Sequence, residues 1–341
     1  MIKVLLADDS VVVRTVLKDI FHATPEITVV GEATNGLEAV ALAERLKPDL
    51  IVMDIMMPVM DGLAAIEIIM ARFPTPILVL SATMDDKEVN YAFTAIKKGA
   101  LDVMEKPRSN GLDHNNGEFS ARIVEKVRML ARIKVIRRWP SHRTPVELKS
   151  GYQSGSRDIL AIGASTGGPK AVMGILKSLP ADLKAAVFIV QHIASGFARG
   201  FSQWLDHDSA IRVRLAVDGE VFNTGEALVA PNDCHMILDK GKVRLVQGEP
   251  VNCCRPSIDV FFNSLADEEG ARVVGVLLTG MGKDGAQGLH RIKEQGGVTI
   301  VQDETSCVVF GMPKAAIALN AVDEILPLPC IPEAISKIFA Q

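Results

Sequence analysis

A serine, a histidine and an aspartate in the second half of the sequence have the side chains that nucleophilic catalysis needs. Ser165 follows the apolar run of "DILAIGAS", His192 ends "VFIVQH", and Asp284 lies in the glycine-rich segment "TGMGKDG". A serine hydroxyl is a weak nucleophile unless a base takes its proton, and that base works best when a carboxylate fixes its tautomer. If the three side chains meet, they predict a hydrolase that forms an acyl-enzyme.

The small residues around Ser165 suit the same chemistry. The glycines of "GASTGGPK" allow a sharp turn, and a helix that begins at about residue 168 directs free N–H groups toward a developing oxyanion. The stretch lacks the spacing of the dinucleotide-binding and Walker motifs, which argues against a phosphate-binding loop. A plain helix cap at Ser165 or Thr166 remains an alternative on these residues alone, as does a structural role for His192.

Polar and charged residues of the first half, three of them aspartates, gather at the ends of predicted strands. Residues of this set end the first, third, fourth and fifth apolar runs: Asp8, Asp9, Asp54, Ser81 and Lys106. Converging carboxylates repel one another unless a cation neutralises them, and Mg²⁺ binds carboxylate, water and phosphate oxygens. An aspartate can also accept a phosphoryl group covalently. The combination favours phosphoryl and Mg²⁺ chemistry over solvated turns and caps.

Alternating strand and helix patterns position both sets of residues. In the first half, strand-like runs lie at residues 3–7, 27–32, 49–54, 76–82 and 100–105, and a second alternation begins at residue 158. This alternation predicts an α/β protein with two doubly wound parallel-sheet domains, each covered by helices on both faces. In such sheets functional residues lie at the carboxyl ends of the strands.

Composition limits the class of protein. The 341 residues are 48% hydrophobic and 23% charged, which fits two globular domains, and the net charge of -4 argues against non-specific nucleic-acid binding. The sequence predicts no signal peptide, and no apolar run reaches the roughly 18 residues that a membrane span needs. The five cysteines lack paired metal-ligand spacing and suit a reducing compartment, so we expect a cytoplasmic protein.

A basic segment joins the two halves. Residues 108–120 are rich in turn formers and predict a loop, and the following pattern places Ile123, Val127 and Leu130 on one helical face. Basic residues occupy the other faces, which we interpret as solvated surface, with nucleic-acid or membrane contact as the alternative. Residues 139–156 predict a linker. The expected boundaries are residues 1–120 for the first domain, 121–155 for the basic helix and linker, and 156–341 for the second domain.

Residues 1 to about 107 resemble a response-regulator receiver domain, a flavodoxin-like fold, through "MDIMMPVMDG" around Asp54 and "EKP" at Lys106. The resemblance implies that Asp54 accepts a phosphoryl group from a histidine kinase and that Asp9 and Asp54 bind Mg²⁺. It further implies that Asp8 acts through water, that Lys106 pairs with the phosphoryl oxygens, and that Ser81 hydrogen-bonds them. The sequence departs from many receivers at Val103, where an aromatic residue is common.

Residues 158 to about 340 resemble the Rossmann-like catalytic domain of the chemotaxis protein-glutamate methylesterases. The motifs that carry this resemblance include "AIGASTGGPKA", "SGFARGFSQWLD", "RPSIDVFF" and "GVLLTGMGKDGAQGL". They imply a Ser165–His192–Asp284 triad and oxyanion donors among the backbone N–H groups near Thr166 and Met281. Many relatives carry a proline where this sequence has Ala194.

Together the two resemblances imply a phosphorylation-regulated hydrolase that removes methyl groups from glutamyl methyl esters of chemoreceptors, releases methanol and deamidates receptor glutamines. We expect Mg²⁺ for receiver phosphorylation and no cofactor for the hydrolase step. The implied partners are methyl-accepting chemoreceptors and the histidine kinase of the chemotaxis pathway, with no nucleic acid and with membranes only through the receptors. A non-catalytic scaffold and a DNA-binding output are the alternatives, although no short three-helix unit with a basic recognition helix follows the linker.

Overall fold

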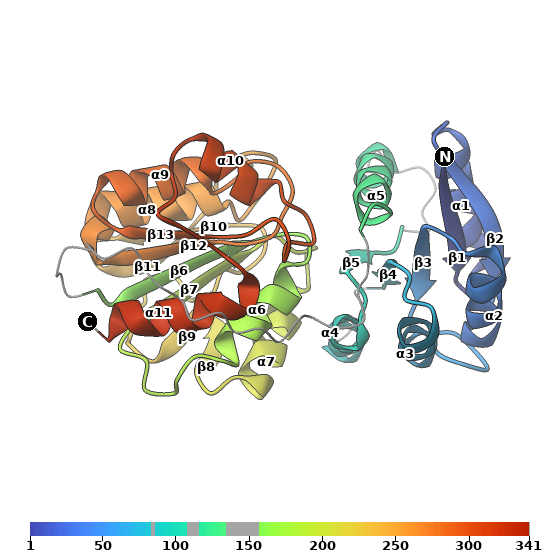
Figure 1. Ribbon diagram of the computed structural model, residues 1–341, viewed down its shortest axis with the longest axis horizontal. Coiled ribbons are helices and arrows are strands. Elements are labelled where there is room, and N and C mark those ends of the chain that lie inside the picture. The colour runs from blue at the N-terminus through green and yellow to red at the C-terminus, as the bar shows by residue number, and fades with distance from the viewer. Residues whose placement is uncertain (83–85, 108–115, 134–156, 341) are drawn as a thin grey trace. The chain divides into compact units, whose positions relative to one another are not determined.

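The computed structural model describes residues 1–82, 86–107, 116–133 and 157–340, and the chain divides into two compact units, residues 1–140 and 141–341 (Figure 1). Each unit contains a parallel sheet with helices packed against it. The predicted fold class, two parallel-sheet α/β domains, is therefore confirmed.

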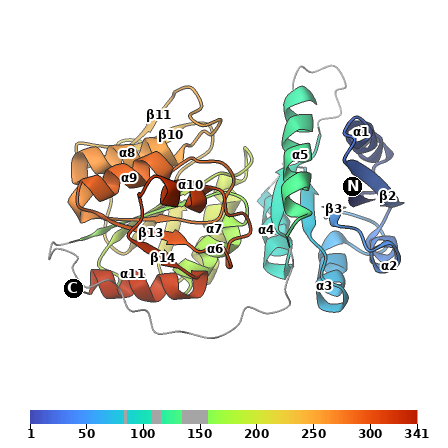
Figure 2. The same ribbon diagram turned by 45° about the horizontal axis from the view of Figure 1, so that its top comes forward.

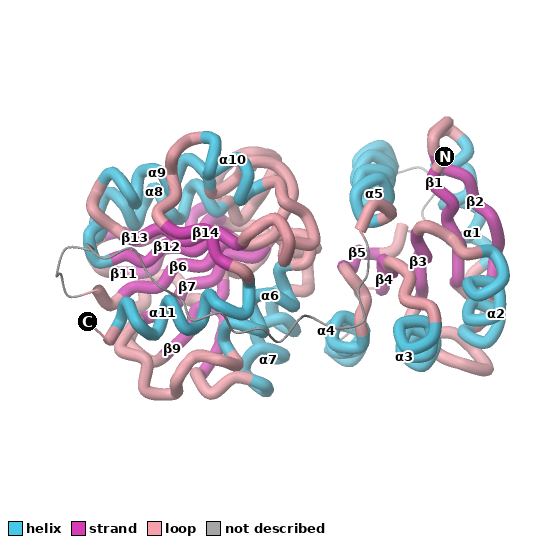
Figure 3. The backbone as a smooth tube through the Cα atoms, in the orientation of Figure 1, coloured by secondary structure: helices cyan, strands magenta, loops and turns pink. Residues whose placement is uncertain are grey.

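The N-terminal unit is built on a five-stranded parallel sheet in the order β2-β1-β3-β4-β5. Its strands are β1 (Ile2–Ala7), β2 (Ile27–Ala33), β3 (Leu50–Asp54), β4 (Ile77–Ser81) and β5 (Asp102–Glu105). Its helices are α1 (Val11–His22), α2 (Gly36–Leu46), α3 (Gly62–Arg72), α4 (Asp86–Lys98) and α5 (Asn116–Leu130). Every residue of β3 and β4 is buried, as expected for central strands covered on both faces (Figure 3).

Local sequence determines how the segment after Asp54 leaves the sheet. Asp61 caps α3 by accepting a hydrogen bond of 2.7 Å from the N–H of Ala64. The next residue, Gly62, packs so closely that a Cβ there would lie 2.1 Å from the carbonyl oxygen of Asp54. The loop from β3 to α3 therefore folds back tightly over the end of the strand, which fixes Asp54 at the edge of the sheet.

The C-terminal unit is built on a seven-stranded parallel sheet in the order β14-β13-β12-β6-β7-β9-β8. The strands are β6 (Ile159–Ala164), β7 (Ala186–Gln191), β8 (Arg212–Leu215), β9 (Glu226–Val229), β12 (Val273–Leu277), β13 (Val298–Gln302) and β14 (Glu324–Leu326). A separate antiparallel hairpin consists of β10 (His235–Asp239) and β11 (Lys242–Val246). The chain passes to opposite sides of β6 to form β7 and β12, which makes β6 the point where the strand order reverses.

Helices cover both faces of this second sheet. Figures 1 and 2 show α8 (Ile258–Glu269), α9 (Ala286–Glu294) and α10 (Met312–Ala318) on one face, and α6 (Gly168–Leu176), α7 (Ala198–Asp208) and α11 (Ile331–Phe339) on the other. Short 3-10 turns lie at Gly270–Arg272 and Leu328–Cys330. Phe188 of β7 packs against Phe261 of α8 in the core, with their ring centroids 5.4 Å apart. This packing holds α8 over the strands that carry the candidate site.

Helix α5 begins earlier than the sequence pattern predicts. The three residues expected on one helical face, Ile123, Val127 and Leu130, are fully buried, which confirms that face. The helix nevertheless starts at Asn116, because Phe119 lies one turn before Ile123 and extends the apolar stripe into the predicted loop. Two of its basic residues form ion pairs within the same unit, Lys126 with the buried Asp102 and Arg128 with Glu26 at the surface.

The predicted linker, residues 139–156, and the basic residues Lys134, Arg137 and Arg138 lie outside the described residues. In the part of the chain that the structure describes, every helix is too short or too polar to span a lipid bilayer.

Candidate functional site

The carboxyl ends of three neighbouring strands carry the predicted nucleophile, base and acid. Ser165 follows β6 directly, His192 follows β7, and Asp284 lies in the loop between β12 and α9. Strand β6 pairs with both β7 and β12, so the three strand ends adjoin one another. The site therefore lies where the strand order reverses, which is the usual ligand-binding edge of an open α/β sheet.

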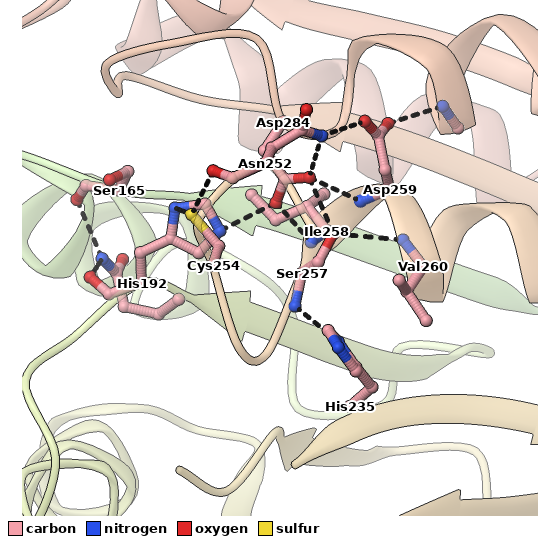
Figure 4. Close-up of polar contacts among 12 residues, drawn as sticks. Ser165, His192, His235, Asn252, Cys254, Ser257, Ile258, Asp259, Val260 and Asp284 are labelled. Carbon is pink, nitrogen blue, oxygen red and sulfur yellow. Dashed lines mark hydrogen bonds and ion pairs between the residues drawn. The ribbon is translucent and has the colours of Figure 1, made fainter. Parts of the chain in front are cut away.

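The predicted base and acid, His192 and Asp284, are in direct contact. His192 Nε2 lies 2.9 Å from Asp284 Oδ2, and Nε2–H donates to the carboxylate (Figure 4). This contact leaves Nδ1 as the imidazole nitrogen available for proton transfer. Gln191 joins the two strand ends, because its side-chain amide donates to the main-chain carbonyls of Ser165 at 2.8 Å and of His192 at 2.9 Å. Among the described residues, Ser165 Oγ makes no hydrogen bond to His192.

Asp284 is buried and holds more hydrogen bonds than the sequence indicated. Its carboxylate accepts from five donors: His192 Nε2, Ser257 Oγ at 2.7 Å, Asn252 Nδ2 at 2.9 Å, and the N–H groups of Ile258 at 2.6 Å and Asp259 at 3.3 Å. The last two N–H groups belong to the first turn of α8, where the positive end of a helix favours an anion. Burial alone raises the pKa of Asp284, but the contact with His192 and the other donors outweigh it, and the pKa is lowered.

A second buried carboxylate lies behind Asp284. Asn252 Nδ2 bridges the two acids, at 2.8 Å from Asp259 Oδ2 and 2.9 Å from Asp284 Oδ1, and the N–H of Gly288 donates to Asp259 Oδ1 at 2.8 Å. Burial is the main cause that raises the pKa of Asp259. Asn252 therefore fixes the position of Asp284 through a neutral amide between two acids.

His235 and Ser257 complete the hydrogen-bond network around Asp284, and the sequence analysis did not predict their roles. His235, for which the sequence revealed no partner, is buried; its Nδ1 accepts from the N–H of Ser257 at 3.1 Å, and its Nε2 donates to the carbonyl of Glu249 at 3.0 Å. Ser257 is the N-cap of α8 and is fully buried. The one available signal was the serine that precedes the helical pattern of "RPSIDVFF", which indicates a cap but not a carboxylate partner.

His192 also contacts a thiol. Cys254 Sγ lies 3.5 Å from His192 Nδ1, on the ring edge opposite the nitrogen bound by Asp284. Burial disfavours protonation of the imidazole, but the hydrogen bond with Asp284 and the contact with Cys254 outweigh it and raise the pKa of His192 to about 9. The imidazole is therefore a strong base once it has lost its proton.

The predicted oxyanion donors lie beside the nucleophile. Helix α6 begins at Gly168, the predicted start, and the loop after β12 lies so close that a Cβ at Gly280 would be 2.7 Å from Ser165 Cβ. Within the described residues, the backbone N–H groups of Thr166 and Met281 donate to no other group. Backbone N–H groups that are not otherwise engaged, in segments next to a serine, suit the binding of an oxyanion.

The first sheet brings together the other predicted residues. Lys106 Nζ lies 2.9 Å from Asp8 Oδ2 and 2.8 Å from Asp54 Oδ2, and both aspartates are buried. Ser81 ends β4 and lines a small pocket together with Asp54 and Lys106. Asp9 is exposed at the rim.

The carboxylates at this edge fit a hard divalent cation. One oxygen from each of Asp8, Asp9 and Asp54 can be chosen so that all three lie within 4.8 Å of one another. Of the described buried atoms, Asp8 Oδ2 and Asp54 Oδ2 are among those that accept no hydrogen bond of normal geometry, although both form the ion pair with Lys106. Burial raises the pKa of Asp54 to about 6; Lys106 opposes this shift and Asp8 adds to it. Clustered, under-satisfied carboxylates of this kind suit Mg²⁺.

Comparison with known proteins finds two families along the chain. The family described as CheB methylesterase matches residues 160–335, and the response regulator receiver domain matches residues 4–113. A protein-glutamate methylesterase/protein-glutamine glutaminase of Geobacter metallireducens is 44% identical, with 99% of each chain covered. Its namesake from Pyrococcus horikoshii is 40% identical over 98% of this chain and 93% of its own. The crystal structure of the Thermotoga maritima CheB methylesterase catalytic domain is 37% identical, covers 54% of this chain and all of its own, and has a TM-score of 0.52.

Proposed function

This chain belongs to the CheB methylesterase family, with a receiver domain before the methylesterase domain, and from that premise we propose that Ser165, His192 and Asp284 form its catalytic triad. The protein is a chemotaxis methylesterase and glutaminase regulated by phosphorylation. The observation that carries the residue assignment is the 2.9 Å hydrogen bond between His192 and Asp284 at strand ends that adjoin Ser165.

Acylation begins when Ser165 Oγ attacks the γ-carbonyl carbon of a glutamyl methyl ester. His192 accepts the serine proton at Nδ1, because Nε2–H is engaged by Asp284. The carbonyl π electrons move to oxygen, and the free N–H groups of Thr166 and Met281 stabilise the resulting charge. When the carbonyl re-forms, the bond to the methoxy oxygen breaks, and His192 returns the proton to it so that methanol leaves.

Deacylation uses the same groups in the same order. Water loses a proton to His192 Nδ1 and attacks the acyl carbon, and the proton is then returned to Ser165 Oγ as the glutamate leaves. A receptor glutamine passes through the same acyl-enzyme, with ammonia as the leaving group. One triad therefore accounts for both activities.

The receiver residues support phosphorylation at Asp54. We assign Asp54 as the phosphoryl acceptor, with Asp9 and Asp54 as the carboxylates that hold Mg²⁺ and with Asp8 acting through water. Bound Mg²⁺ would neutralise the charge of the carboxylates and of the incoming phosphoryl group. Lys106, already paired with Asp54, would pair with a phosphoryl oxygen, and Ser81 would donate its hydroxyl proton to another.

The proposed partners follow from these two sites. A kinase supplies the phosphoryl group and a chemoreceptor supplies the substrate; we assign the kinase as the histidine kinase of the chemotaxis pathway. All five cysteines are free thiols in the structure, and we propose the cytoplasm as the location. In its described residues the unit after the linker is one large α/β sheet rather than a three-helix DNA-binding unit, so nothing in it supports a DNA-binding output.

The triad is tested by the release of labelled methanol from methylated receptor membranes. Ser165→Ala should lower the rate by about a thousandfold or more, because the nucleophile is removed, with little change in melting temperature. Methanol release near the wild-type rate from this variant would refute the assignment. If the wild type itself released no methanol in the presence of phosphodonor and Mg²⁺, the non-catalytic scaffold would be favoured instead.

A further inference from the structure

We propose that Cys254 and His192 form a binding site for a thiophilic divalent cation, with Zn²⁺ as the cation that fits best, and that metal bound there inhibits the hydrolase. This site shares His192 with the proposed triad and is distinct from the carboxylate cluster of the receiver. No sequence pattern indicated this site, because the cysteines show no metal-ligand spacing among themselves and the two ligands are 62 positions apart.

The distance between the two ligand atoms matches a metal site. Cys254 Sγ and His192 Nδ1 are 3.5 Å apart (Figure 4). A tetrahedral zinc ion, with bonds of about 2.3 Å to sulfur and about 2.0 Å to nitrogen, separates two such ligands by about 3.5 Å. A thiolate and an imidazole together select Zn²⁺ or Co²⁺ over Mg²⁺ and Ca²⁺, which prefer oxygen ligands.

Asp284 has the position of an outer partner rather than of a ligand. It accepts the Nε2–H of His192 at 2.9 Å, which fixes the ring and directs the lone pair of Nδ1 toward Cys254. A carboxylate that orients a metal-binding histidine in this way strengthens the ligand. The carboxylate oxygens of Asp284 already accept from the cap and first turn of α8 and from Asn252, so its lone pairs are occupied.

The turn that presents Cys254 is held in place before any metal binds. Val251 and Cys254 exchange two main-chain hydrogen bonds of 2.9 and 3.1 Å around Asn252 and Cys253. Both central residues have positive φ angles, 51° and 62°, which is the conformation of a type I′ turn. The side chain of Asn252 anchors this turn to Asp284 and Asp259. Cys254 and His192 are each partly exposed, so a cation can reach both from solvent.

Metal at this site would remove the base from the reaction. His192 Nδ1 is the atom that takes the proton of Ser165, and a lone pair shared with a cation cannot accept a proton. Binding releases two protons to solvent, one from Nδ1 of the protonated His192 and one from the Cys254 thiol, and a chelator reverses the step. The inhibitory part rests on the proposed function, whereas metal binding by the two side chains does not.

Metal binding is tested with Co²⁺ and the full-length chain, reduced and freed of metal. The wild type should develop thiolate-to-cobalt charge-transfer absorption that saturates at one equivalent for this site, and Cys254→Ser should lose it. Cys253→Ser is the matched control, because Cys253 is an exposed cysteine on the same turn, and it should keep the band. Co²⁺ bound by the receiver carboxylates adds no thiolate band. A band that persists in Cys254→Ser, or is lost in Cys253→Ser, would overturn the site.

Inhibition is tested by Zn²⁺ titration of methanol release, with each variant compared with its own metal-free rate. Zn²⁺ should inhibit the wild type and Cys253→Ser reversibly, with recovery in EDTA, and Cys254→Ser should need at least tenfold more Zn²⁺. Equal sensitivity of all three proteins would refute inhibition through Cys254. If the wild type shows the cobalt band but releases no methanol, the metal site stands and the esterase assignment fails.

Discussion

The two functional edges of this protein both lie at the carboxyl ends of parallel strands, yet the pKa of the buried aspartate is shifted in opposite directions at the two edges. Asp54 has one cationic partner, Lys106, and burial raises its pKa to about 6. Asp284 accepts from five donors, and its pKa is lowered despite burial. An under-satisfied carboxylate retains capacity for an incoming cation or phosphoryl group, whereas a saturated one can only orient its neighbour.

The difference originates in the elements that surround each acid. Asp284 faces the N-terminus of α8, where the cap Ser257 and two N–H groups of the first turn all donate to it. Asp54 ends a strand, and the N–H of Met56, at 3.3 Å, is its main-chain donor. The helix end favours the charged form of Asp284, whereas the strand end leaves the Asp54 carboxylate with capacity for a further partner.

The largest effect is expected when the saturated acid is neutralised. Asp284→Asn should lower kcat by about ten-thousandfold, because an amide cannot hold the tautomer of His192 that leaves Nδ1 free. It should also lower the melting temperature, since buried donors lose a charged acceptor. Methanol release and thermal unfolding measure both effects.

Asp323→Asn is the matched control for that variant. Asp323 accepts two hydrogen bonds of 2.9 Å from Thr299 in the same sheet, away from the triad. The control should lose stability but not kcat. If the two variants lost activity to the same extent, Asp284 would be a structural acid only, and the contrast between the two edges would disappear.

Neutralising the under-satisfied acid should give a smaller effect of a different kind. Asp54→Asn should abolish the stimulation of methanol release by an acyl phosphate and Mg²⁺, a gain of about 5- to 150-fold for an allosteric coupling of ordinary size. Because the folded-state pKa of Asp54 is raised, its charged form opposes folding at neutral pH, so the variant should not have a lower melting temperature.

The exposed Asp49, which accepts from the N–H of Lys3, provides the control in the same unit. Asp49→Asn should keep the full stimulation. If Asp54→Asn retained the stimulation, Asp54 would not be the phosphoryl acceptor. A marked loss of stability in this variant would show that the Asp54 carboxylate is already well hydrogen-bonded in the folded protein.

The sequence predicted the residues that belong to strand ends and missed those that belong to turns and caps. Ser165, His192 and Asp284 could be placed together because parallel strands in one sheet bring their carboxyl ends to one edge. The same rule placed Asp54 and Lys106. Residue type and position suggested their chemistry, and the family resemblance then favoured a triad over a helix cap at Ser165 and a structural role for His192.

The supporting residues could not be found in this way. Asn252 and Cys254 lie in a short turn whose direction depends on how residues 248–257 pass over the sheet, and no local pattern specifies that path. Ser257 was recognisable as a helix cap, but its second hydrogen bond, to Asp284, depends on where α8 packs. The start of α5 was misplaced for a related reason, since the half-buried Phe119 extends the apolar stripe of the helix into a stretch rich in turn-forming residues.

The smallest predicted effect concerns the pH at which the base becomes active. Two groups face the imidazole of His192: Asp284 at Nε2 and Cys254 at Nδ1. Both raise its pKa, against burial, to about 9. Because acylation needs the unprotonated ring, kcat/KM should rise with pH, and the midpoint of this limb should lie near pH 9. The bound proton stabilises the folded state fully below the ordinary pKa of 6.5, and this contribution is lost as pH rises through about 9, so activity should rise while stability falls.

Replacing Cys254 separates its influence from that of Asp284. In Cys254→Ala one of the contacts that raise the pKa is gone, so the limb of kcat/KM should move to lower pH in EDTA-treated protein, while Cys253→Ala should leave it in place. The displacement should be smaller than any effect of Asp284, because the hydrogen bond to the carboxylate is the larger of the two causes. A limb that stays fixed, or moves to higher pH, would mean that the thiol does not influence the imidazole in solution, and the saturated carboxylate alone would then set the strength of the base.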